Sequence, residues 1–436
     1  MSLKDKVGCA ASVLLILIYA QVWFGIATDY GSNASDHLGA VFLTGYAISL
    51  AMISVKPTVF FRAIRRLPFL IILLTLCTAS IYWSIDPEHS SRRVPGLIFT
   101  SLGGLALAMR WPWHRFVQML AISFAVMAAM SLLLGLVFPD LGRMTDIFPG
   151  AWRGVWLEKN SLGAMMALGA LVQLAAAAMN PQQRVWWISA ATLSFCLTLL
   201  STSKTSLLIL LMGLSAQAFL VFVKGGPARA IIGTWSAVVA VAAVAGLLLV
   251  QSDLILDGLG KDSTLTGRTK IWSGIQRQMV GEEWTGFGFG AFWDTSGPAR
   301  PALRVAADAD FMPPHAHNGW LEGFLAIGYP GVIVFGLWLL QMWLGTIRAL
   351  FTSNTSWLLL PFMIAYTTAM LTESITLNVH DPWWVLFVAV SARMVLGDDA
   401  ECTPRHRTLS RSPADFHKTN ATTRPRDPRR NRRMSH

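Results

Sequence analysis

Residues 116–138 read FVQMLAISFAVMAAMSLLLGLVF, a stretch without a charged side chain. An α-helix needs roughly 20 mostly apolar residues to cross the hydrocarbon core of a bilayer, so this stretch predicts a membrane-spanning helix. Similar stretches recur along most of the chain, which is 54% hydrophobic and only 14% charged, with a mean hydropathy of +0.50. The alternation with a period of two that is typical of membrane barrels is absent. The sequence therefore predicts an all-α polytopic membrane protein.

We expect about twelve transmembrane helices, with one long loop between the ninth and the tenth. The apolar stretches that predict them cover approximately residues 10–28, 38–55, 67–84, 94–109, 116–138, 160–179, 185–201, 205–223, 230–250, 320–347, 357–374 and 383–396. Four regions follow: helices 1–9 in residues 1–250, the long loop in 251–316, helices 10–12 in 317–396 and a basic tail in 397–436.

Positive charges predict the orientation of these helices. The N-terminal segment and every second connection collect twelve Lys and Arg side chains, whereas the other short connections hold six. Because cytoplasmic connections are enriched in Lys and Arg, both termini are expected in the cytoplasm and the loop 251–316 on the periplasmic side. The first apolar stretch is long enough to span the membrane, and we interpret it as an uncleaved helix rather than a secretory signal.

The C-terminal tail is strongly basic. Residues 402–436 carry +8 of the chain's net charge of +11, among Pro, Thr, Ser and Asn. Such a composition cannot bury enough apolar surface to fold, so we expect a disordered tail that contacts anionic membrane lipids. Nucleic-acid binding is the alternative, but no aromatic or folded module accompanies the charge, and we expect no nucleic-acid partner.

The cysteine positions give no sign of a disulfide framework or a thiolate metal site. All of them fall in or beside apolar stretches or in the tail: Cys9, Cys77, Cys196 and Cys402.

The long loop concentrates polar motifs. Arg268 follows Gly267, with Trp272 four residues on, and the stretch 271–280 predicts a short amphipathic helix that Gly281 ends. The run Gly286-Phe-Gly-Phe-Gly290 predicts an irregular turn. Four prolines predict extended or coiled backbone over 297–314. We expect helix to resume near His317, with His317, Leu321 and Phe324 on one helical face.

Arginines on the outer side oppose the positive-inside bias and need a reason. The planar guanidinium donates two parallel hydrogen bonds to a phosphate, which suits a lipid-linked pyrophosphate at the bilayer surface. Arg143, Arg153 and Arg268 are the candidates, with Arg92 or Arg93 in addition. The alternative is that each is an interfacial arginine whose side chain extends toward water.

His317 is the candidate base. A neutral imidazole at this position could take a proton from a sugar hydroxyl that attacks an anomeric carbon, and a helix N-terminus beside it would favour an anion. Alternatively, His317 or Asn318 only caps the helix. Glu322 would orient the histidine or an acceptor sugar.

A metal site is the weaker interpretation of these residues. Two histidines and a carboxylate suffice for zinc, and His315, His317 and Glu322 supply them. Histidines two residues apart at a coil–helix junction are a weak metal signature, so we expect none. The glycine run around Gly288 lacks the lysine of a nucleotide-binding loop and is interpreted as a backbone turn that a glycan or headgroup can approach closely.

Several motifs together resemble the O-antigen ligase/polymerase superfamily (Wzy/WaaL-like), and most closely its ExoQ-type exopolysaccharide polymerases. In chain order the motifs are Trp83-Ser-Ile-Asp86-Pro, Glu158-Lys159-Asn160, Asp262-Ser-Thr-Leu-Thr-Gly267-Arg268 with Trp272, Gly286-x-Gly-x-Gly290 and His317-Asn318. The resemblance covers about residues 10–396 and leaves out the tail.

The resemblance implies a GT-C-like fold in the bacterial inner membrane and a glycosyltransferase without metal or other cofactor. The donor would be an undecaprenyl-pyrophosphate-linked oligosaccharide, whose repeat units are polymerised at the periplasmic face, and a chain-length-determining co-polymerase would be a partner. Arg268 and either Arg143 or Arg153 would bind pyrophosphate, and His317 would activate the acceptor hydroxyl or hold the donor. The remaining candidate substrate-binding residues are Lys159, Asn160, Trp272, Gly288 and Asn318.

Three other functions are weighed against a polymerase. A ligase of the same superfamily would differ only in its acceptor. A flippase for lipid-linked oligosaccharides predicts charges buried near the centres of spans, whereas Lys204 is the outer-side charge pressed most closely between two apolar stretches. A scaffold without chemistry predicts that replacing His317 has no effect.

Overall fold

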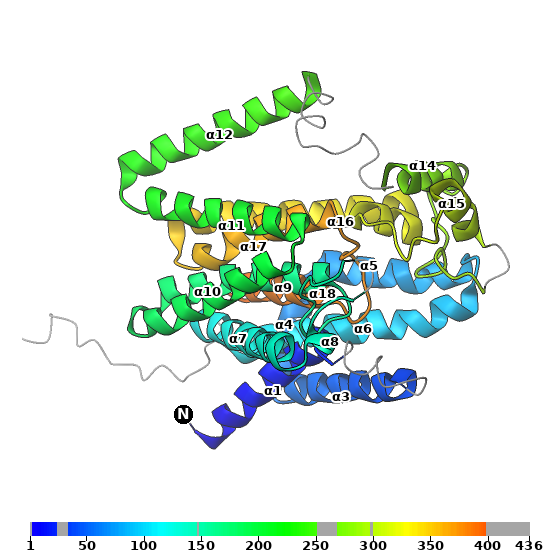
Figure 1. The fold of residues 1–436 in the computed structure, drawn as a ribbon. Coiled ribbons are helices and arrows are strands. Elements are labelled where there is room, and N and C mark those ends of the chain that lie inside the picture. The colour runs from blue at the N-terminus through cyan, green and yellow to red at the C-terminus, as the bar shows by residue number, and fades with distance from the viewer. Residues whose placement is uncertain (1, 24–33, 146–147, 251–267, 297–299, 398–436) are drawn as a thin grey trace, which may run out of the picture. The chain divides into compact units, whose positions relative to one another are not determined.

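A helix overlaps each of the twelve apolar stretches of the sequence. The computed structural model describes residues 2–23, 34–145, 148–250, 268–296 and 300–397, and residues 1–400 form one compact unit. The twelve helices, labelled in Figure 1, are α1 (Leu3–Tyr19), α3 (Ala34–Ser54), α5 (Pro68–Ala79), α6 (Pro87–Arg110), α7 (Trp113–Val137), α9 (Lys159–Met179), α10 (Arg184–Leu200), α11 (Lys204–Val223), α12 (Pro227–Val250), α16 (Gly319–Thr352), α17 (Ser356–Met370) and α18 (Pro382–Leu396). The expected all-α class is confirmed for the described residues, where the only pairing outside helices is an isolated bridge between Arg143 and Trp152.

Four helices are long and apolar enough to cross a membrane on their own, namely α7, α9, α11 and α16. A fifth span results if α3 and α4 (Pro57–Arg65), which are bent by 99° at their junction, count as one. Others are shorter: α5 has 12 residues, which at 1.5 Å per residue is less than the roughly 30 Å of hydrocarbon. The structure therefore supports a multi-pass helical membrane protein, and twelve crossings stay a prediction.

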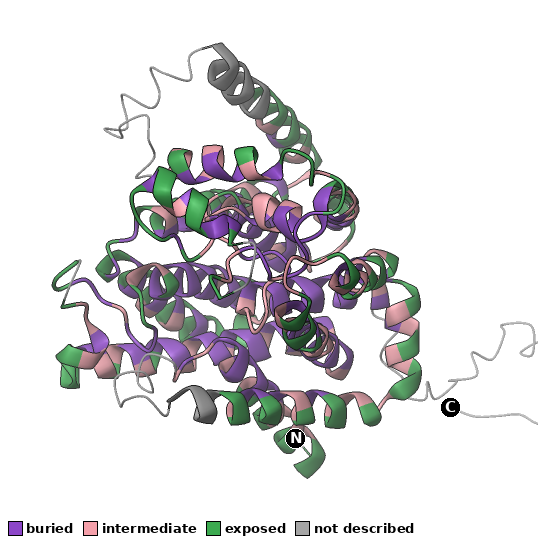
Figure 2. Ribbon diagram, turned by 90° about the vertical axis from the view of Figure 1, so that its right-hand side faces the viewer, coloured by how far each residue is buried: buried purple, intermediate pink, exposed green. Residues whose placement is uncertain are grey.

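The surface of the longest apolar helices fits a lipid environment. α9 lies among α7, α10, α11 and α17, and most of its residues are buried. Large apolar side chains on other helices are exposed instead, and Figure 2 shows exposed positions in green along several helices. They include Leu133 and Leu136 on α7, Leu208 and Leu211 on α11, and Ile333, Leu337, Leu340 and Leu344 on α16. Exposed apolar side chains on helices that are long enough to span a bilayer are typical of contact with membrane lipid.

The described part of the long loop has a core of its own. α14 (Arg268–Met279) packs against α15 (Pro301–Ala309), and Ile271, Ile275 and Val305 are buried between them. The expected short helix is confirmed: it begins at Arg268, and Gly281, with φ +90°, follows its end. The expectation of coil over 297–314 is wrong for 301–309.

The prolines of this segment wrongly predict coil, because a proline is compatible with a helix when it lies in the first turn. Pro301 is the first residue of α15, where its missing N–H removes no helical hydrogen bond. Alanine and leucine follow it directly, and both are strong helix formers.

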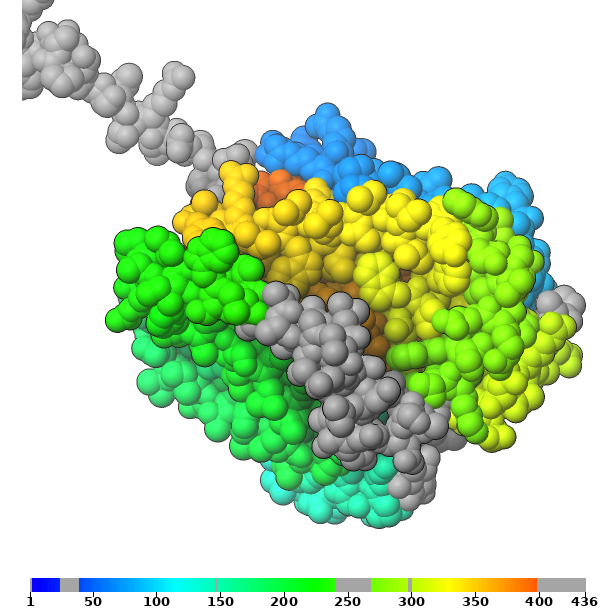
Figure 3. All heavy atoms as spheres, turned by 90° about the horizontal axis from the view of Figure 1, so that it is seen from above, coloured from blue at the N-terminus to red at the C-terminus, as the bar shows by residue number. Residues whose placement is uncertain are grey.

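The loop docks into a break in α16. Ile327 and Gly328 leave helical geometry, and Gly328 has φ +61°. The Phe287 N–H donates to the Leu325 carbonyl (2.8 Å), and the Tyr329 N–H donates to the Glu283 carbonyl (2.8 Å). On the face shown in Figure 3, α16 (yellow) and the segment containing α14 (yellow-green) lie side by side. The break therefore fixes the loop to the helix that follows it.

Hydrogen bonds between the segments that connect the helices divide these segments into two groups. They are the same two groups that the numbers of Lys and Arg predict for the two sides of the membrane. Within the group predicted to be periplasmic, Gln21 donates to the His380 carbonyl (2.9 Å) and Trp83 Nε1 to the Thr285 carbonyl (2.9 Å). The other group is joined by bonds from Arg110 to Lys4, from Arg66 to Val395 and from Lys224 to Ser353. The orientation of the two groups stays a prediction from charge.

Candidate functional site

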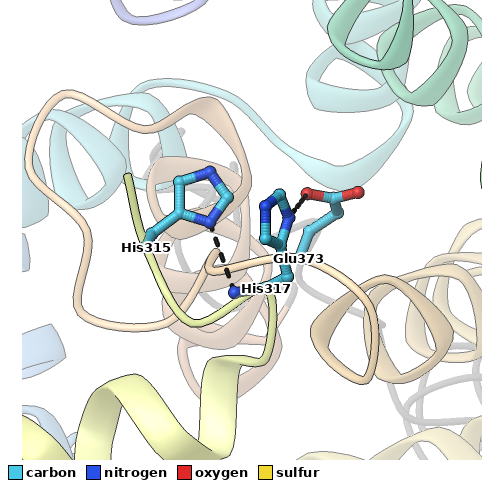
Figure 4. Close-up of side chains that lie close together, drawn as sticks. All are labelled: His315, His317 and Glu373. Carbon is cyan, nitrogen blue, oxygen red and sulfur yellow. Dashed lines mark hydrogen bonds and ion pairs between the residues drawn. The ribbon is translucent and has the colours of Figure 1, made fainter. Parts of the chain in front are cut away.

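Glu373 joins two of the predicted site residues. Arg268 is the first residue of α14, His317 precedes α16, and Glu373 follows α17. One guanidinium nitrogen of Arg268 lies 3.6 Å from Glu373 Oε1, and His317 Nδ1 lies 3.5 Å from Glu373 Oε2. Each of the three side chains is 20 to 25% exposed. Figure 4 shows Glu373 facing the imidazole of His317.

His317 has a strained backbone. Its φ is +50°, in the left-handed region that a residue with a side chain rarely adopts. Its N–H donates to Nδ1 of His315 (3.3 Å), and the two rings lie 4.0 Å apart. The expectation that His317 lies on a helical face with Leu321 is therefore wrong.

The backbone N–H groups at the start of α16 find their hydrogen-bond acceptor in Asn318 and not in His317. Asn318 is the N-cap of α16, and its Oδ1 accepts from the N–H groups of Trp320 (2.9 Å) and Leu321 (3.2 Å). The capping alternative weighed for these two residues is thus confirmed for Asn318. Because Asn318 satisfies these N–H groups, the His317 side chain is left for other contacts.

The peptide between the two histidines is held from both sides. Glu322 Oε1 accepts from the Ala316 N–H (2.6 Å), and Trp272 Nε1 donates to the Ala316 carbonyl (2.9 Å). Glu322 also accepts from Ser374 and Trp293. Glu322 and Trp272, predicted as catalytic and substrate-binding residues, thus make the contacts of positioning residues.

Two cavities meet at His315. The first, which we call the His317 cavity, has a volume of about 210 Å³, and its lining includes Glu158, Asn160, His317, Glu373 and Asp381. The second, the Arg93 cavity, has a volume of about 190 Å³, and its lining includes Arg93, Gly290, Trp293, Glu322 and Thr376. Both share a wall made of His315, Ser374 and Asn378.

Two titratable groups beside the His317 cavity have shifted pKa values. Burial raises the pKa of Asp381 to about 7, against the hydrogen bonds that it accepts from the N–H groups of Trp383 and Trp384. Burial, and then the nearby His317, lowers the pKa of His315 to about 4. His315 is therefore neutral at pH 7, whereas Asp381 is divided between its two forms.

The two arginines of the 139–159 connection lie elsewhere. Arg143 donates to the Gly135 carbonyl (3.0 Å) and stacks over Trp152 at 5.1 Å, and Arg153 donates to the Leu141 carbonyl (2.9 Å). Neither lines either cavity. These contacts hold the connection itself in shape, and the structure does not bring the two arginines to His317.

Of the remaining predicted site residues, some line the His317 cavity and others contact the protein elsewhere. Asn160 lines the His317 cavity, whereas the Lys159 ammonium lies 3.4 Å from Thr202 Oγ1 and 3.5 Å from the ring centre of Phe148. Gly288 packs against Ser84, because a Cβ there would lie 2.4 Å from that side chain. At Gly288 the glycine run therefore packs against the protein's own Ser84 and not against a glycan or a headgroup.

A metal-binding set exists, but with a different carboxylate from the one weighed in the sequence. Donor atoms of His315, His317 and Glu373 all lie within 4.8 Å of one another. Two imidazoles and a carboxylate are a ligand set that zinc accepts. Glu322 instead binds the Ala316 backbone. A cation here would compete with Arg268 for Glu373.

Sequence reasoning missed Glu373 and Asp381. Both belong to residues 372–381, TESITLNVHD, between the last two apolar stretches. The signal is present in the sequence, since seven of these ten residues have polar or titratable side chains. The predicted helix over 357–374 hides Glu373, because α17 ends at Met370 and leaves Glu373 in the connection.

Comparison with known proteins finds one distant relative. No protein-family model matches the chain. The chain is 30% identical over 292 residues to the exopolysaccharide production protein ExoQ of Rhizobium meliloti (strain 1021). The aligned region covers 63% of this chain and 64% of ExoQ, which is less than two thirds of that protein's length. The chain is thus distantly related to a protein of exopolysaccharide production.

Proposed function

We propose that this protein is a polysaccharide polymerase of the bacterial inner membrane. It joins oligosaccharide repeat units that are linked to undecaprenyl pyrophosphate, at the periplasmic face, and uses no metal. The observation that carries the proposal is the meeting of Arg268 and His317 at Glu373, beside a cavity lined by Asn160. The relationship to ExoQ supports the exopolysaccharide class.

The reaction is the displacement of a diphosphate by a sugar hydroxyl. The hydroxyl oxygen of the acceptor repeat unit bonds to the anomeric carbon of the donor, and the bond from that carbon to the pyrophosphate oxygen breaks. The hydroxyl proton passes to His317 Nε2. Glu373 faces Nδ1 of the same ring, so its negative charge stabilises the imidazolium that forms.

Arg268 acts on the leaving group. The diphosphate gains negative charge as the glycosidic bond breaks, and a fixed guanidinium stabilises that charge without reorganisation. The contact with Glu373 restrains Arg268 in this position. The role expected for an arginine of the 139–159 connection would need a movement of that connection, since Arg143 and Arg153 are bound to backbone carbonyls.

The test is a profile of lipid-linked glycans in a strain that lacks the protein and is complemented with variants. Arg268→Ala and His317→Ala should each lower polymer yield about a hundredfold or more, the usual effect of removing a transition-state donor. Lipid-linked single repeats should accumulate on the outer face of the membrane. Arg277→Ala is the matched control, because Arg277 lies on the same helix and pairs with Asp308.

The other outcomes separate the rival functions. Accumulation of full-length lipid-linked polymer would identify a ligase, and repeats retained on the cytoplasmic face would identify a flippase. Normal polymer in both variants would refute chemistry at this site. Dependence of chain length on a second protein would reveal the expected co-polymerase.

A further inference from the structure

Arg93 is a cation that forms no ion pair with a carboxylate in the part of the chain that the structure describes. It lies on α6, near the predicted outer surface, and its Nε is buried without a hydrogen-bond partner among the described residues. The charges of Glu322 and Asp294 act on Arg93 from nearby, but both carboxylates make their direct contacts elsewhere: Glu322 with the Ala316 N–H, and Asp294 with His89 (2.6 Å). Removing a guanidinium from water without an ion pair is unfavourable, so its position calls for an anionic group.

The backbone around Arg93 is shaped to leave room for it. Gly290 has φ +76°, and a Cβ at that position would lie 2.6 Å from Arg93 Cδ. A residue with a side chain would therefore displace the guanidinium arm from the Arg93 cavity. By contrast, the neighbouring Arg92 is exposed and pairs with Glu88. The difference between two successive arginines indicates that Arg93 has a specific environment.

The rest of the cavity suits a sugar ring. Phe289 and Trp293 supply aromatic surface, and Ser374 and Asn378 supply hydrogen-bonding groups. Thr376 Oγ1 is buried without a hydrogen-bond partner among the described residues. The volume of about 190 Å³ equals that of about six water molecules in the liquid, which admits one sugar residue but not a chain.

We propose that the Arg93 cavity is a saccharide subsite for one sugar residue that carries a negatively charged substituent, and that Arg93 binds this substituent. The inference rests on the proposed function, in which donor and acceptor sugars must meet at His317. The wall of His315, Ser374 and Asn378 shared by the two cavities places this subsite directly beside the base. The oxyanion is either a carboxylate of an acidic sugar or a phosphate of the lipid carrier, since the guanidinium binds both.

Binding by the purified full-length protein in nanodiscs tests the inference without turnover. The probes are a trisaccharide ending in glucuronic acid, the same trisaccharide ending in glucose, and undecaprenyl diphosphate. Wild type should bind one anionic probe more tightly than the neutral trisaccharide. Arg93→Ala should weaken that binding at least about tenfold and leave the neutral trisaccharide unchanged, because the guanidinium contacts only the charged group. Arg92→Ala is the matched control and should behave as wild type.

The result identifies the source of the oxyanion. Weaker binding of the acidic trisaccharide alone assigns a carboxylate, and weaker binding of undecaprenyl diphosphate alone assigns a phosphate. Arg93→Lys, which keeps the charge but not the planar fork, should retain part of the affinity. Equal loss for all probes, or no loss for any, overturns the inference. Because His317→Ala tests polymerisation separately, a polymerase whose Arg93 binds neither anion would refute only this subsite.

Discussion

At the scale of single residues, Asp381 makes the charge of the His317 cavity depend on pH. Its carboxyl lines that cavity and caps α18 through the N–H groups of Trp383 and Trp384. Burial raises its pKa to about 7, so the carboxyl is mostly protonated in mildly acidic conditions. The ionised form adds negative charge beside Glu373 as the pH rises.

This shift predicts how stability depends on pH. Between about pH 4 and pH 7 the unfolded chain carries an ionised Asp381, whereas the folded protein keeps it protonated. The unfolded state thus binds fewer protons, and the contribution of Asp381 to stability falls as the pH rises through this range. Asp381→Asn removes that dependence. The melting temperature of the variant minus that of wild type, measured in detergent, should increase from pH 5 to pH 7.5.

The Asn side chain is a suitable replacement because its Oδ1 can accept the bonds from Trp383 and Trp384. A difference in melting temperature that stays constant over this pH range would contradict the raised pKa. A difference that decreases would show that the pKa is lowered.

The sequence was sufficient to identify Arg268 and His317 as candidate site residues. It was not sufficient to predict which residue each of them contacts. Arg268 and His317 stand out because a cation and an imidazole in an outer loop have few structural reasons to be there. Glu373 could not be paired with them, since it lies in a different connection and only the fold brings it near. Glu322 was close in sequence, but its carboxylate is used by Ala316.

At the scale of elements, the break in α16 joins the loop to the membrane helices. Gly328 combines φ +61° with ψ −159°, and the backbone of Glu283 and Trp284 lies against it. The sequence predicted helix over 320–347 without this break, because the apolar pattern continues through Gly328 and Pro330. Tertiary contact with the loop determines the local geometry here.

Two glycines of α16 test this role. Gly328→Ala should destabilise the protein by at least about 2 kcal/mol, because the left-handed conformation is strained for alanine and the new Cβ would lie 2.5 Å from the Trp284 backbone. Gly323→Ala should be neutral or stabilise by up to about 1 kcal/mol, since a Cβ there meets nothing within 4 Å. Thermal unfolding in detergent measures both. Equal effects of the two substitutions would refute a special role for the break.

At the scale of the whole molecule, the helices were predictable and the number of crossings was not. Apolar stretches locate helices reliably because a buried or lipid-facing backbone must satisfy its own hydrogen bonds. Whether a helix such as α5 crosses the bilayer depends on its neighbours and its tilt. The hydropathy of the sequence carries no information about either. The contacts between connections nevertheless divide them into two groups that match the charge count.

Reporter fusions test the orientation of these groups. Alkaline phosphatase fused after Gly281, in the predicted periplasmic loop, should be active, because the enzyme requires the periplasm to fold. The same reporter fused after Gly225, between α11 and α12, or after Gly397 should be inactive, and green fluorescent protein should give the reverse pattern. Activity after Gly225 and none after Gly281 would invert the topology and place the candidate site in the cytoplasm.

The double anchoring of Ala316 has a consequence for how this site tolerates variation. Trp272 binds the Ala316 carbonyl and Glu322 binds the Ala316 N–H, so the main chain fixes the positions from which the two flanking imidazoles extend. Loop substitutions that leave Trp272 and Trp293 in place can be made without disturbing these positions. Adding or deleting a single residue between Pro314 and Asn318 would shift Ala316 relative to Trp272 and Glu322. Both imidazole rings would then be misplaced together.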